Sequence, residues 1–151
     1  MRRRSRISGL RLVREMSVPI TDAPIHVSGP RDVLRLMAPL AALEPGEVLW
    51  VLALNAQHRV LSDPIVVTRG LVNQSPIHAR EVFRAAIAAG AVAVVLVHNH
   101  PSGDPTPSVD DVRVTRDLHA AGVLLDIPLL DHVIVGHGGA FRSLAEMGCL
   151  G

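Results

Sequence analysis

Cysteine is nearly absent from this 151-residue chain, since Cys149 is its only thiol. One thiol excludes a disulfide framework and a cysteine-rich zinc cluster. It also disfavours a zinc-dependent base deaminase, because the cysteine pair of the P-C-x-x-C motif of those enzymes is missing. The composition is compatible with a reducing compartment, and we expect a soluble, cytoplasmic protein.

Long hydrophobic runs and aromatic residues are also scarce. The longest apolar run, residues 85–97, is too short to span a bilayer and is rich in alanine and glycine. No signal-peptide core follows the N-terminal arginines, because Arg and Glu interrupt residues 7–16. We therefore expect no membrane partner. The aromatic residues are few, so the sequence outlines no substrate pocket; they are Trp50, Phe83 and Phe141.

A strong excess of charge of one sign is missing too, since the net charge is +1 at pH 7. This balance gives no overall reason to expect a nucleic-acid partner. Arginines nevertheless crowd the start of the chain, at positions 2, 3, 4, 6, 11 and 14. A basic arm over residues 1–27 could contact phosphates, although a solvated, frayed terminus is the simpler interpretation.

What the sequence does contain is an alternation of helix and strand signals. We expect helices over 28–39, 75–90 and 108–122, with N-caps at Ser28 or Gly29, at Ser75 and at Ser108. We expect strands over 47–55, 59–70, 91–98, 123–128 and 131–136, and a strand or turn over 141–148. This order predicts one α/β domain, in which a mixed sheet is sandwiched between helices.

Prolines and glycines give the expected limits of these elements. Pro39 should kink or end the first helix, and Pro64 should mark a bulge or an edge in the second strand. Pro76 should take the first position of the second helix, and Gly122 should end the third. The second helix should bury one apolar stripe, which consists of Ile77, Val82, Phe83, Ala86 and Ile87.

The segment HNHPSGDPTPSVDD, residues 98–111, concentrates the groups that can carry out chemistry. Residues i and i+2 of a strand point to the same face, so His98 and His100 should project together with Asn99 turned away. Two neutral imidazoles so close together form a ligand pair suited to Zn²⁺. The proline-rich loop that follows cannot continue the strand and should turn the next helix start back towards the histidines.

That helix start would supply a third ligand. With Ser108 as cap, Asp111 takes the third helical position, where the helix dipole favours a carboxylate. Asp110, at the second position, is the competing ligand. Two imidazoles and a carboxylate without a thiolate describe an open site that leaves a fourth position for water, as catalytic zinc centres do. The alternative is a metal-free turn whose imidazoles bond carbonyl groups, followed by an ordinary capping box.

The pattern H-x-H-x(7)-S-x-x-D, formed by His98, His100, Ser108 and Asp111, resembles the JAMM motif of JAB/MPN-domain zinc metallopeptidases. Together with SPIHAREVFRAAI, LLDHVIVGHGGAFRSLAEMG and LALNAQHRVL, it makes residues 28–151 similar to the RadC family of bacterial proteins. The resemblance implies a cytidine-deaminase-like α/β/α fold and one zinc ion per chain, bound by both histidines and Asp111. Longer RadC proteins add a helix-hairpin-helix region, for which we expect no room before residue 28. A DNA-binding role borrowed from them therefore lacks support in these residues.

The resemblance also implies roles for two further residues. Ser108 would support the oxyanion or the bound water, and Glu47, which opens a buried strand, would be the general base. A solvated strand end is the alternative interpretation of Glu47. Glu81 is the rival base, but its i, i+3 spacing to Arg84 on a helix predicts a surface ion pair.

The resemblance implies hydrolysis of a peptide or isopeptide bond in a peptide or protein substrate, by a zinc-activated water. Other polar residues could support a ligand or contact the substrate, although a structural role explains each more simply; these are His78, Asp131 and His132. Two other functions stay open. One is an interaction module that hydrolyses nothing, and the other is a DNA-repair-associated accessory protein that uses the arginine arm.

Overall fold

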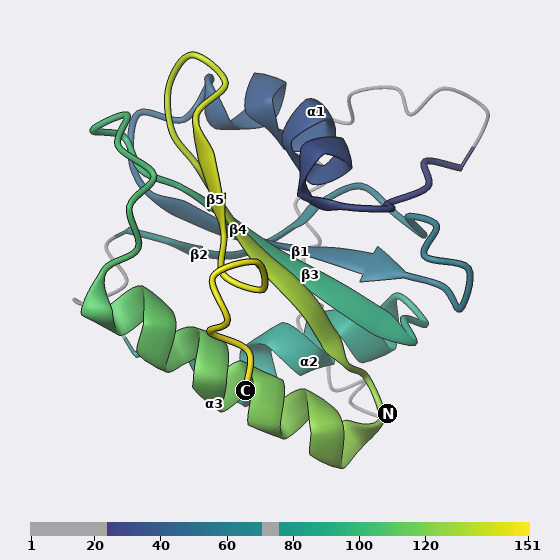
Figure 1. Cartoon of the computed structure of the whole chain (residues 1–151). Helices are drawn as coiled ribbons and strands as arrows, with labels where there is room; N and C mark the ends of the chain where they lie inside the picture. Colours follow the sequence, from purple (N-terminus) through teal and green to yellow (C-terminus); the bar gives the residue numbers. More distant parts are fainter. Residues whose placement is uncertain (1–23, 71–75) are drawn as a thin grey trace, which may run out of the picture.

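A computed structural model of the chain describes residues 24–70 and 76–151 and shows three layers (Figure 1). A five-stranded sheet lies between α1 (Pro30–Ala41) on one face and α2 (Ala79–Ala88) and α3 (Val109–Leu125) on the other. The strands are β1 (Val48–Leu54), β2 (Ile65–Arg69), β3 (Ala93–Asn99), β4 (Leu129–Val135) and β5 (Phe141–Ser143). The predicted α/β domain with a mixed sheet between helices is confirmed.

The order of the strands across the sheet is β2-β1-β3-β4-β5. β1 pairs antiparallel with both β2 and β3, β3 pairs parallel with β4, and β4 pairs antiparallel with β5. The parallel pair needs a crossover connection, and α3 supplies it. β3 therefore leads directly into the loop and helix that carry the candidate metal ligands.

Both faces of β1 and β3 are buried, as their nearly continuous hydrophobic sequences predict. Alternate residues point to opposite faces of the sheet. Trp50 and Val95 pack with α1, whereas Val51 and Leu96 pack with α2 and α3. The same alternation directs His98, two residues after Leu96, to the layer of α2 and α3.

The positions of Pro39 and Pro64 relative to their helix and strand differ from the prediction. Pro39 does not end α1, which continues to Ala41, because Met37 and Ala41 both pack into the core. Pro64 precedes β2 instead of lying within it. β2 is nevertheless an edge strand, where the missing N–H of a nearby proline does little harm.

The second helix is shorter than the sequence predicts. α2 begins at Ala79 with His78 as its extended N-cap, so Pro76 does not take its first position. Ser75 lies outside the described residues. The prediction that Ile87 belongs to the buried apolar stripe is wrong. Ile87 is 59% exposed, because it lies outside the helix face that packs on the sheet. The stripe is confirmed for Ile77, Val82, Phe83 and Ala86.

The third helix runs past Gly122, contrary to the prediction that this glycine ends it, and continues to Leu125. A Cβ on Gly122 would lie 2.6 Å from the carbonyl oxygen of Ile127, so the glycine allows the helix to pack closely against the chain that follows. The helix ends where Asp126 adopts a left-handed conformation with φ 55°. The strand predicted over 123–128 is therefore wrong, because its first half is helical.

Residues 24–27, the described part of the expected N-terminal arm, are joined to the domain. The backbone N–H of Val27 donates to the carbonyl oxygen of His58, and Val27 is buried. The crowded arginines of the arm fall in residues 1–23, outside the described part of the chain. Within residues 24–70 and 76–151, no helix combines the length and hydrophobicity needed to cross a membrane.

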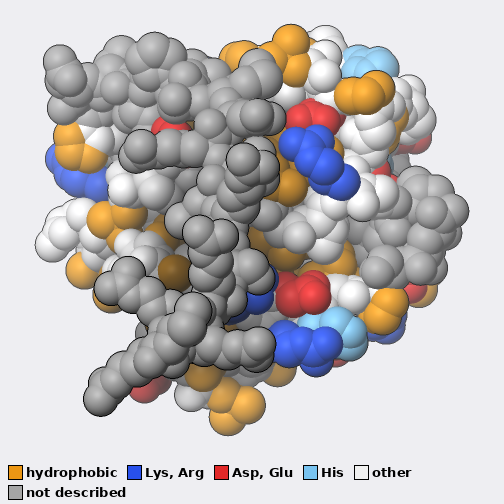
Figure 2. Space-filling model, turned by 180° about the vertical axis from the view of Figure 1, so that it is seen from behind, with side chains coloured by type: hydrophobic (Ala, Val, Ile, Leu, Met, Phe, Trp, Pro, Cys, Tyr) orange, Lys and Arg blue, Asp and Glu red, His pale blue; other side chains and the backbone are white. Residues whose placement is uncertain are grey.

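Exposed hydrophobic side chains lie on β2, on α2 and at both ends of α3. In the view from behind they lie at several separate places between charged side chains (Figure 2). Val109, at the start of α3, and Leu124, near its end, are the most exposed at 87% and 85%. They are separated along the helix by roughly 22 Å, at about 1.5 Å per residue. They therefore belong to different parts of the surface, and Val109 directly follows Ser108 in the chain.

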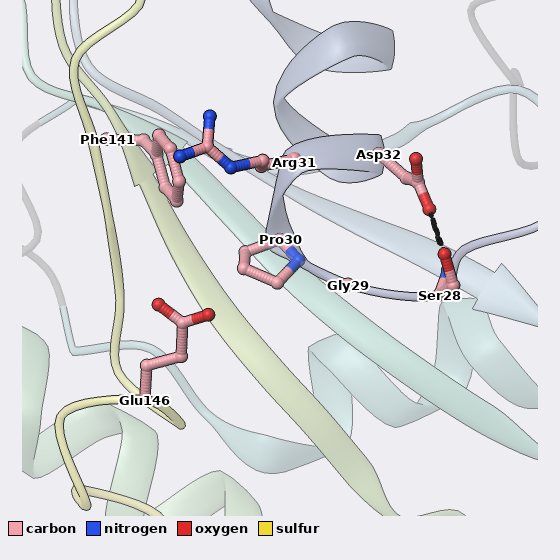
Figure 3. Close-up of a pocket in the computed structure, with 7 residues that line it drawn as sticks. All are labelled: Ser28, Gly29, Pro30, Arg31, Asp32, Phe141 and Glu146. Atoms are coloured by element: carbon pink, nitrogen blue, oxygen red, sulfur yellow. Dashed lines mark hydrogen bonds between the residues drawn. The ribbon is translucent and has the colours of Figure 1, made fainter.

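A hollow of about 270 Å³ lies at the N-terminus of α1 (Figure 3). The Arg31 guanidinium lies over the Phe141 ring, with its Cζ atom 5.8 Å from the ring centre, and Glu146 lines the same hollow. None of the residues that line it comes from the histidine segment, so this hollow is separate from the candidate metal centre.

Candidate metal centre

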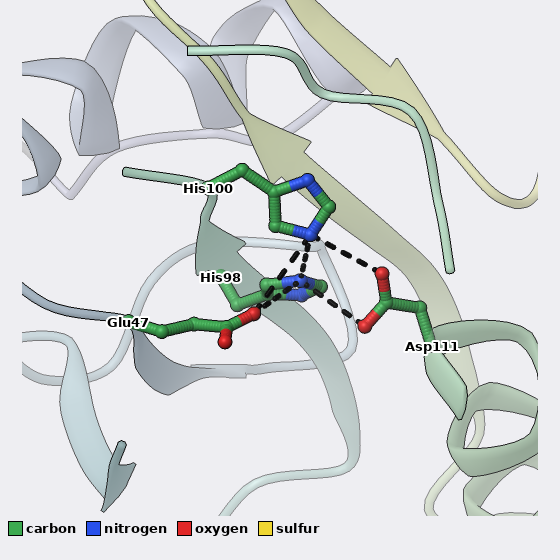
Figure 4. Close-up of side chains that lie close together, drawn as sticks. All are labelled: Glu47, His98, His100 and Asp111. Atoms are coloured by element: carbon green, nitrogen blue, oxygen red, sulfur yellow. Dashed lines mark hydrogen bonds and ion pairs between the residues drawn. The ribbon is translucent and has the colours of Figure 1, made fainter. Parts of the chain in front are cut away.

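The end of β3 and the start of α3 converge as predicted, and they bring His98, His100 and Asp111 together (Figure 4). The Nε2 atoms of the two histidines lie 2.8 Å apart. Asn99 turns away from them, and its side-chain oxygen accepts a hydrogen bond from the Val48 backbone N–H. His98 is fully buried and His100 is partly exposed, so the pair spans the boundary between core and solvent.

Asp111 is held by the capping box that begins α3. The Ser108 hydroxyl accepts a hydrogen bond from the Asp111 backbone N–H at 3.0 Å, and the Ser108 backbone N–H donates to Asp111 Oδ2 at 2.8 Å. The carboxylate faces both histidines, with Oδ1 3.3 Å from His98 Nε2 and Oδ2 3.2 Å from His100 Nε2. The cap therefore aims a buried carboxylate at the imidazoles as well as starting the helix.

Glu47 lies directly before β1 and forms a cluster with His98, His100 and Asp111. β1 and β3 are antiparallel with Leu49 opposite His98, so Glu47 falls beside the histidines on the same face of the sheet. Its Oε1 atom is 3.4 Å from His98 Nε2 and 3.8 Å from His100 Nε2. The carboxylate therefore points into the cluster and is not a solvated strand end.

Charges in the cluster shift two pKa values in opposite directions. Burial raises the pKa of the Asp111 carboxyl, but the adjacent imidazoles of His100 and His98 outweigh burial and hold this pKa well below its usual range. The hydrogen bond with Asp111 raises the pKa of His100 against the effect of burial. Asp111 is therefore ionised at neutral pH, and its negative charge attracts a proton or a metal cation to the imidazoles.

The donor atoms fit a small divalent cation. One ligand atom from each of Glu47, His98, His100 and Asp111 lies within 4.8 Å of all the others. In a tetrahedral zinc site with bonds of about 2.0–2.2 Å, neighbouring ligand atoms are separated by roughly 3.3–3.6 Å. The contacts among the two imidazoles and Asp111 span 2.8 to 3.3 Å, which is close to this separation. These residues could therefore hold a metal ion without a change of fold.

The rival residues lie outside the cluster. Asp110 pairs with Arg113 at 3.3 Å on the solvent side of α3. Glu81 lies on α2 and is not among the clustered groups. The ion pair expected between Glu81 and Arg84 is absent from the described residues. Ser108 caps the helix as predicted, and the residue is exposed.

Of the three polar residues considered as supports, only His132 contacts the cluster. Its Nε2 atom lies 2.7 Å from His98 Nδ1, and burial lowers the pKa of His132 well below its usual value. Asp131 instead accepts a hydrogen bond from the Ser143 hydroxyl and holds the C-terminal turn. His78 is exposed at the N-cap of α2. Asp131 therefore has a structural role, and His78 lies outside the cluster.

Sequence reasoning missed Thr115, which lies one turn after Asp111 on the buried face of α3. Its hydroxyl oxygen is 2.6 Å from His132 Nδ1 and 2.7 Å from the Asp111 carbonyl oxygen. The i, i+4 spacing from Asp111 places a threonine on the helix face that points at the sheet. This spacing is the one signal in the sequence that could have indicated it.

Comparison with known proteins agrees with the motif and the fold. A sequence model described as the RadC-like JAB domain matches residues 27–149. The chain is 42% identical over 145 residues to UPF0758 protein STH371 of Symbiobacterium thermophilum, a match that covers 95% of the chain and 60% of the relative. It is 39% identical over 137 residues to a UPF0758 protein of Methanosarcina mazei, which covers 91% of the chain and 59% of the relative.

These relatives are longer than the chain, which spans about 60% of their length. Their names state a family and no activity. The match to the family nevertheless covers the whole sheet, all three helices and every residue of the cluster. The resemblance inferred from the sequence is confirmed, and the chain belongs to the RadC-like JAB domain family.

Proposed function

We propose that this chain is a zinc-dependent hydrolase that cleaves an amide bond in a peptide or protein substrate. The position of Glu47 carries the proposal. Its carboxylate faces the histidine pair from the side opposite Asp111 (Figure 4). The side chains of His100 and Glu47 keep 16% and 10% of their surface accessible. Such access to solvent suits a catalytic centre, whereas the ligands of a structural centre close it.

His98, His100 and Asp111 would hold the zinc ion. Bound there, the ion would supply the positive charge that acidifies water and polarises a substrate carbonyl. Glu47 would accept the proton of the attacking water and then donate it to the leaving amine, acting first as base and then as acid. Its carboxylate is suited to this, because its ion-pair neighbours among the described residues are the two histidines.

Ser108 would assist at the carbonyl oxygen of the substrate. Its hydroxyl oxygen accepts from the Asp111 N–H, so the hydroxyl proton is left to donate. The residue lies at the exposed start of α3 beside Val109, where a substrate can reach it. A donor in this place would stabilise the negative charge that develops on the carbonyl oxygen during attack.

The metal content of the purified chain tests the first half of the proposal. We expect one equivalent of zinc in the wild type and its loss in His98→Ala and in Asp111→Ala. Asp110→Ala is the matched control, because Asp110 is adjacent but lies outside the cluster, and this variant should keep its zinc. Full zinc occupancy in both ligand variants would refute the assignment.

Cleavage of peptides from a digested cell extract tests the second half, with new amino termini counted by mass spectrometry. Glu47→Gln should keep zinc and slow cleavage by about 10²- to 10⁴-fold, the usual contribution of a general base. Glu81→Gln should cleave like the wild type. If zinc-loaded wild type forms no new termini, or Glu47→Gln is as active as wild type, the chain is better explained as an interaction module.

A further inference from the structure

Three polar side chains form a row behind the candidate metal centre, between α3 and the sheet. The row runs from His98 through His132 to Thr115. His98 and Thr115 are fully buried, and His132 is 1% exposed. The two contacts along the row measure 2.7 Å and 2.6 Å. Buried polar groups need hydrogen-bond partners, so each proton in this row must meet an acceptor.

The far end of the row determines the direction of its hydrogen bonds. The Thr115 hydroxyl lies 2.7 Å from the backbone carbonyl oxygen of Asp111, which can only accept. A hydroxyl has one proton, and donation to this carbonyl leaves the Thr115 oxygen to act as an acceptor. Nδ1 of His132 therefore carries a proton and donates it to Thr115 at 2.6 Å.

The same assignment of protons can be continued from His132 to His98. Among the described residues, the ring nitrogens of the buried His132 bond only to His98 and Thr115, and burial disfavours a charge on the ring. A neutral imidazole has one N–H, so Nε2 of His132 is an acceptor. It accepts from Nδ1–H of His98, and a neutral His98 then presents a bare Nε2 to the cluster.

His100 reaches the same state through another contact. Its Nδ1 atom lies 2.8 Å from the carbonyl oxygen of Asp104, so Nδ1 donates and Nε2 is bare in the neutral ring. Two lone pairs then face each other across 2.8 Å. A cation between the two nitrogen atoms offsets the repulsion of the lone pairs. A bare Nε2 on each ring is also what a histidine needs in order to bind a metal through that atom.

We infer that Thr115 and His132 are positioning residues that fix the tautomer and ring orientation of His98 for metal binding. The inference rests on the proposed function and deepens it. Thr115 and His132 would raise the affinity of the site for the metal without contacting the metal themselves. If Thr115 donated to His132 instead, every proton in the row would reverse. Nε2 of His98 would then carry a proton, and the ring could not bind a metal through this atom.

Zinc titration against a chromophoric chelator tests the row. Thr115→Val keeps the shape of the side chain but removes the hydroxyl, and it should weaken zinc affinity by about 10- to 100-fold, as losses of ligand-supporting partners do. Thr115→Ser restores the hydroxyl and should bind zinc nearly as the wild type does. His132→Gln keeps an acceptor for His98 Nδ1–H and should lose less affinity than His132→Leu.

Val133→Ala is the control for packing, because Val133 is a buried neighbour of His132 that faces the other core. It should lower stability and leave zinc affinity unchanged. Wild-type affinity in Thr115→Val would overturn the inference. A loss in Val133→Ala equal to that in Thr115→Val would also overturn it, since the cause would then be loosened packing.

Nitrogen-15 NMR of the imidazole rings reads the tautomer directly. We expect His132 to be protonated at Nδ1 alone, both without metal and with zinc. A wild type that binds zinc while its His132 is protonated at Nε2 would overturn this inference and leave the proposed function standing. A wild type that binds no zinc would overturn the proposed function, and the inference with it.

Discussion

Asn99 anchors the backbone on both sides of Glu47 to the end of β3. Its Oδ1 atom accepts from the Val48 N–H at 2.8 Å, and its Nδ2 atom donates to the Gly46 carbonyl oxygen at 2.9 Å. Asn99 lies between the two candidate histidine ligands in the chain. One tripeptide therefore supplies two candidate ligands on one face and positions the proposed base from the other.

Replacing Asn99 with leucine should displace Glu47 without removing a candidate ligand. The buried Val48 N–H would lose its partner, which should lower the free energy of unfolding by about 1–3 kcal/mol. We expect cleavage to fall by about tenfold to hundredfold because the base is misplaced, while zinc content stays the same. Denaturant unfolding, metal analysis and peptide cleavage measure the three quantities.

Val97→Ala is the matched control for the Asn99 variant, since Val97 is buried on the same face of β3. It should lower stability through lost packing, with cleavage per folded chain close to wild type. Equal losses of cleavage in both variants would show that the hydrogen bonds of Asn99 have no special effect on Glu47.

Zinc affinity should fall as the pH falls, because the His100 imidazole takes up a proton that competes with zinc. The hydrogen bond with Asp111 raises the pKa of His100 above its ordinary 6.5. Below this raised pKa, zinc must displace a proton from the ring, so affinity should drop by about tenfold per pH unit. Above it, the imidazole is already bare and the dependence should level off. Zinc titrations across the range measure this slope, and an affinity independent of pH on the acid side would contradict it.

Gly136→Ala should disturb the loop that supports His100. A Cβ at position 136 would collide with the carbonyl oxygen of Gly103 and lie 3.0 Å from Pro105 Cδ. These residues flank Asp104, whose carbonyl oxygen accepts from His100 Nδ1. We expect weaker zinc binding and a loss of about 1–3 kcal/mol in the free energy of unfolding, from overpacking.

The control for this loop variant is Gly29→Ala, because nothing lies within 4 Å of the Cβ that it would add. Its zinc affinity should match wild type. If Gly136→Ala also binds zinc with wild-type affinity, the loop does not set the position of His100.

Two substitutions of Ser108 separate its capping role from its proposed role at the substrate. Ser108→Ala removes the cap that accepts from the Asp111 N–H and should cost about 1 kcal/mol of stability, whereas Ser108→Gly should cost only a few tenths. Both remove the hydroxyl, so both should lose cleavage to a similar extent. Thermal unfolding and cleavage assays measure these effects. Full activity in Ser108→Gly would limit Ser108 to capping.

Features that depend on a few neighbouring residues were predicted well. The alternation in β3 correctly placed His98 and His100 on one side and Asn99 on the other, and the S-x-x-D spacing correctly gave the capping box. The end of α3 was predicted wrongly, because Gly122 is a packing glycine within the helix and only its neighbour Ile127 reveals this.

Contacts between distant segments could not be derived in this way. Spacing alone did not single out Glu47, which the family resemblance indicated and which the antiparallel register of β1 and β3 brings to His98. Thr115 was overlooked, because a buried threonine on a helix has no function until the residue opposite it is known.

The sequence by itself determined the buried strand β3, the cap of α3 and which groups could bind a metal, because side-chain periodicity and capping act over a few residues. Only the tertiary structure decided that Glu47, His98 and Asp111 meet, and that His132 connects His98 to Thr115. These contacts depend on the strand register and on the parallel crossover through α3. Both are set when the two cores pack on opposite faces of the sheet.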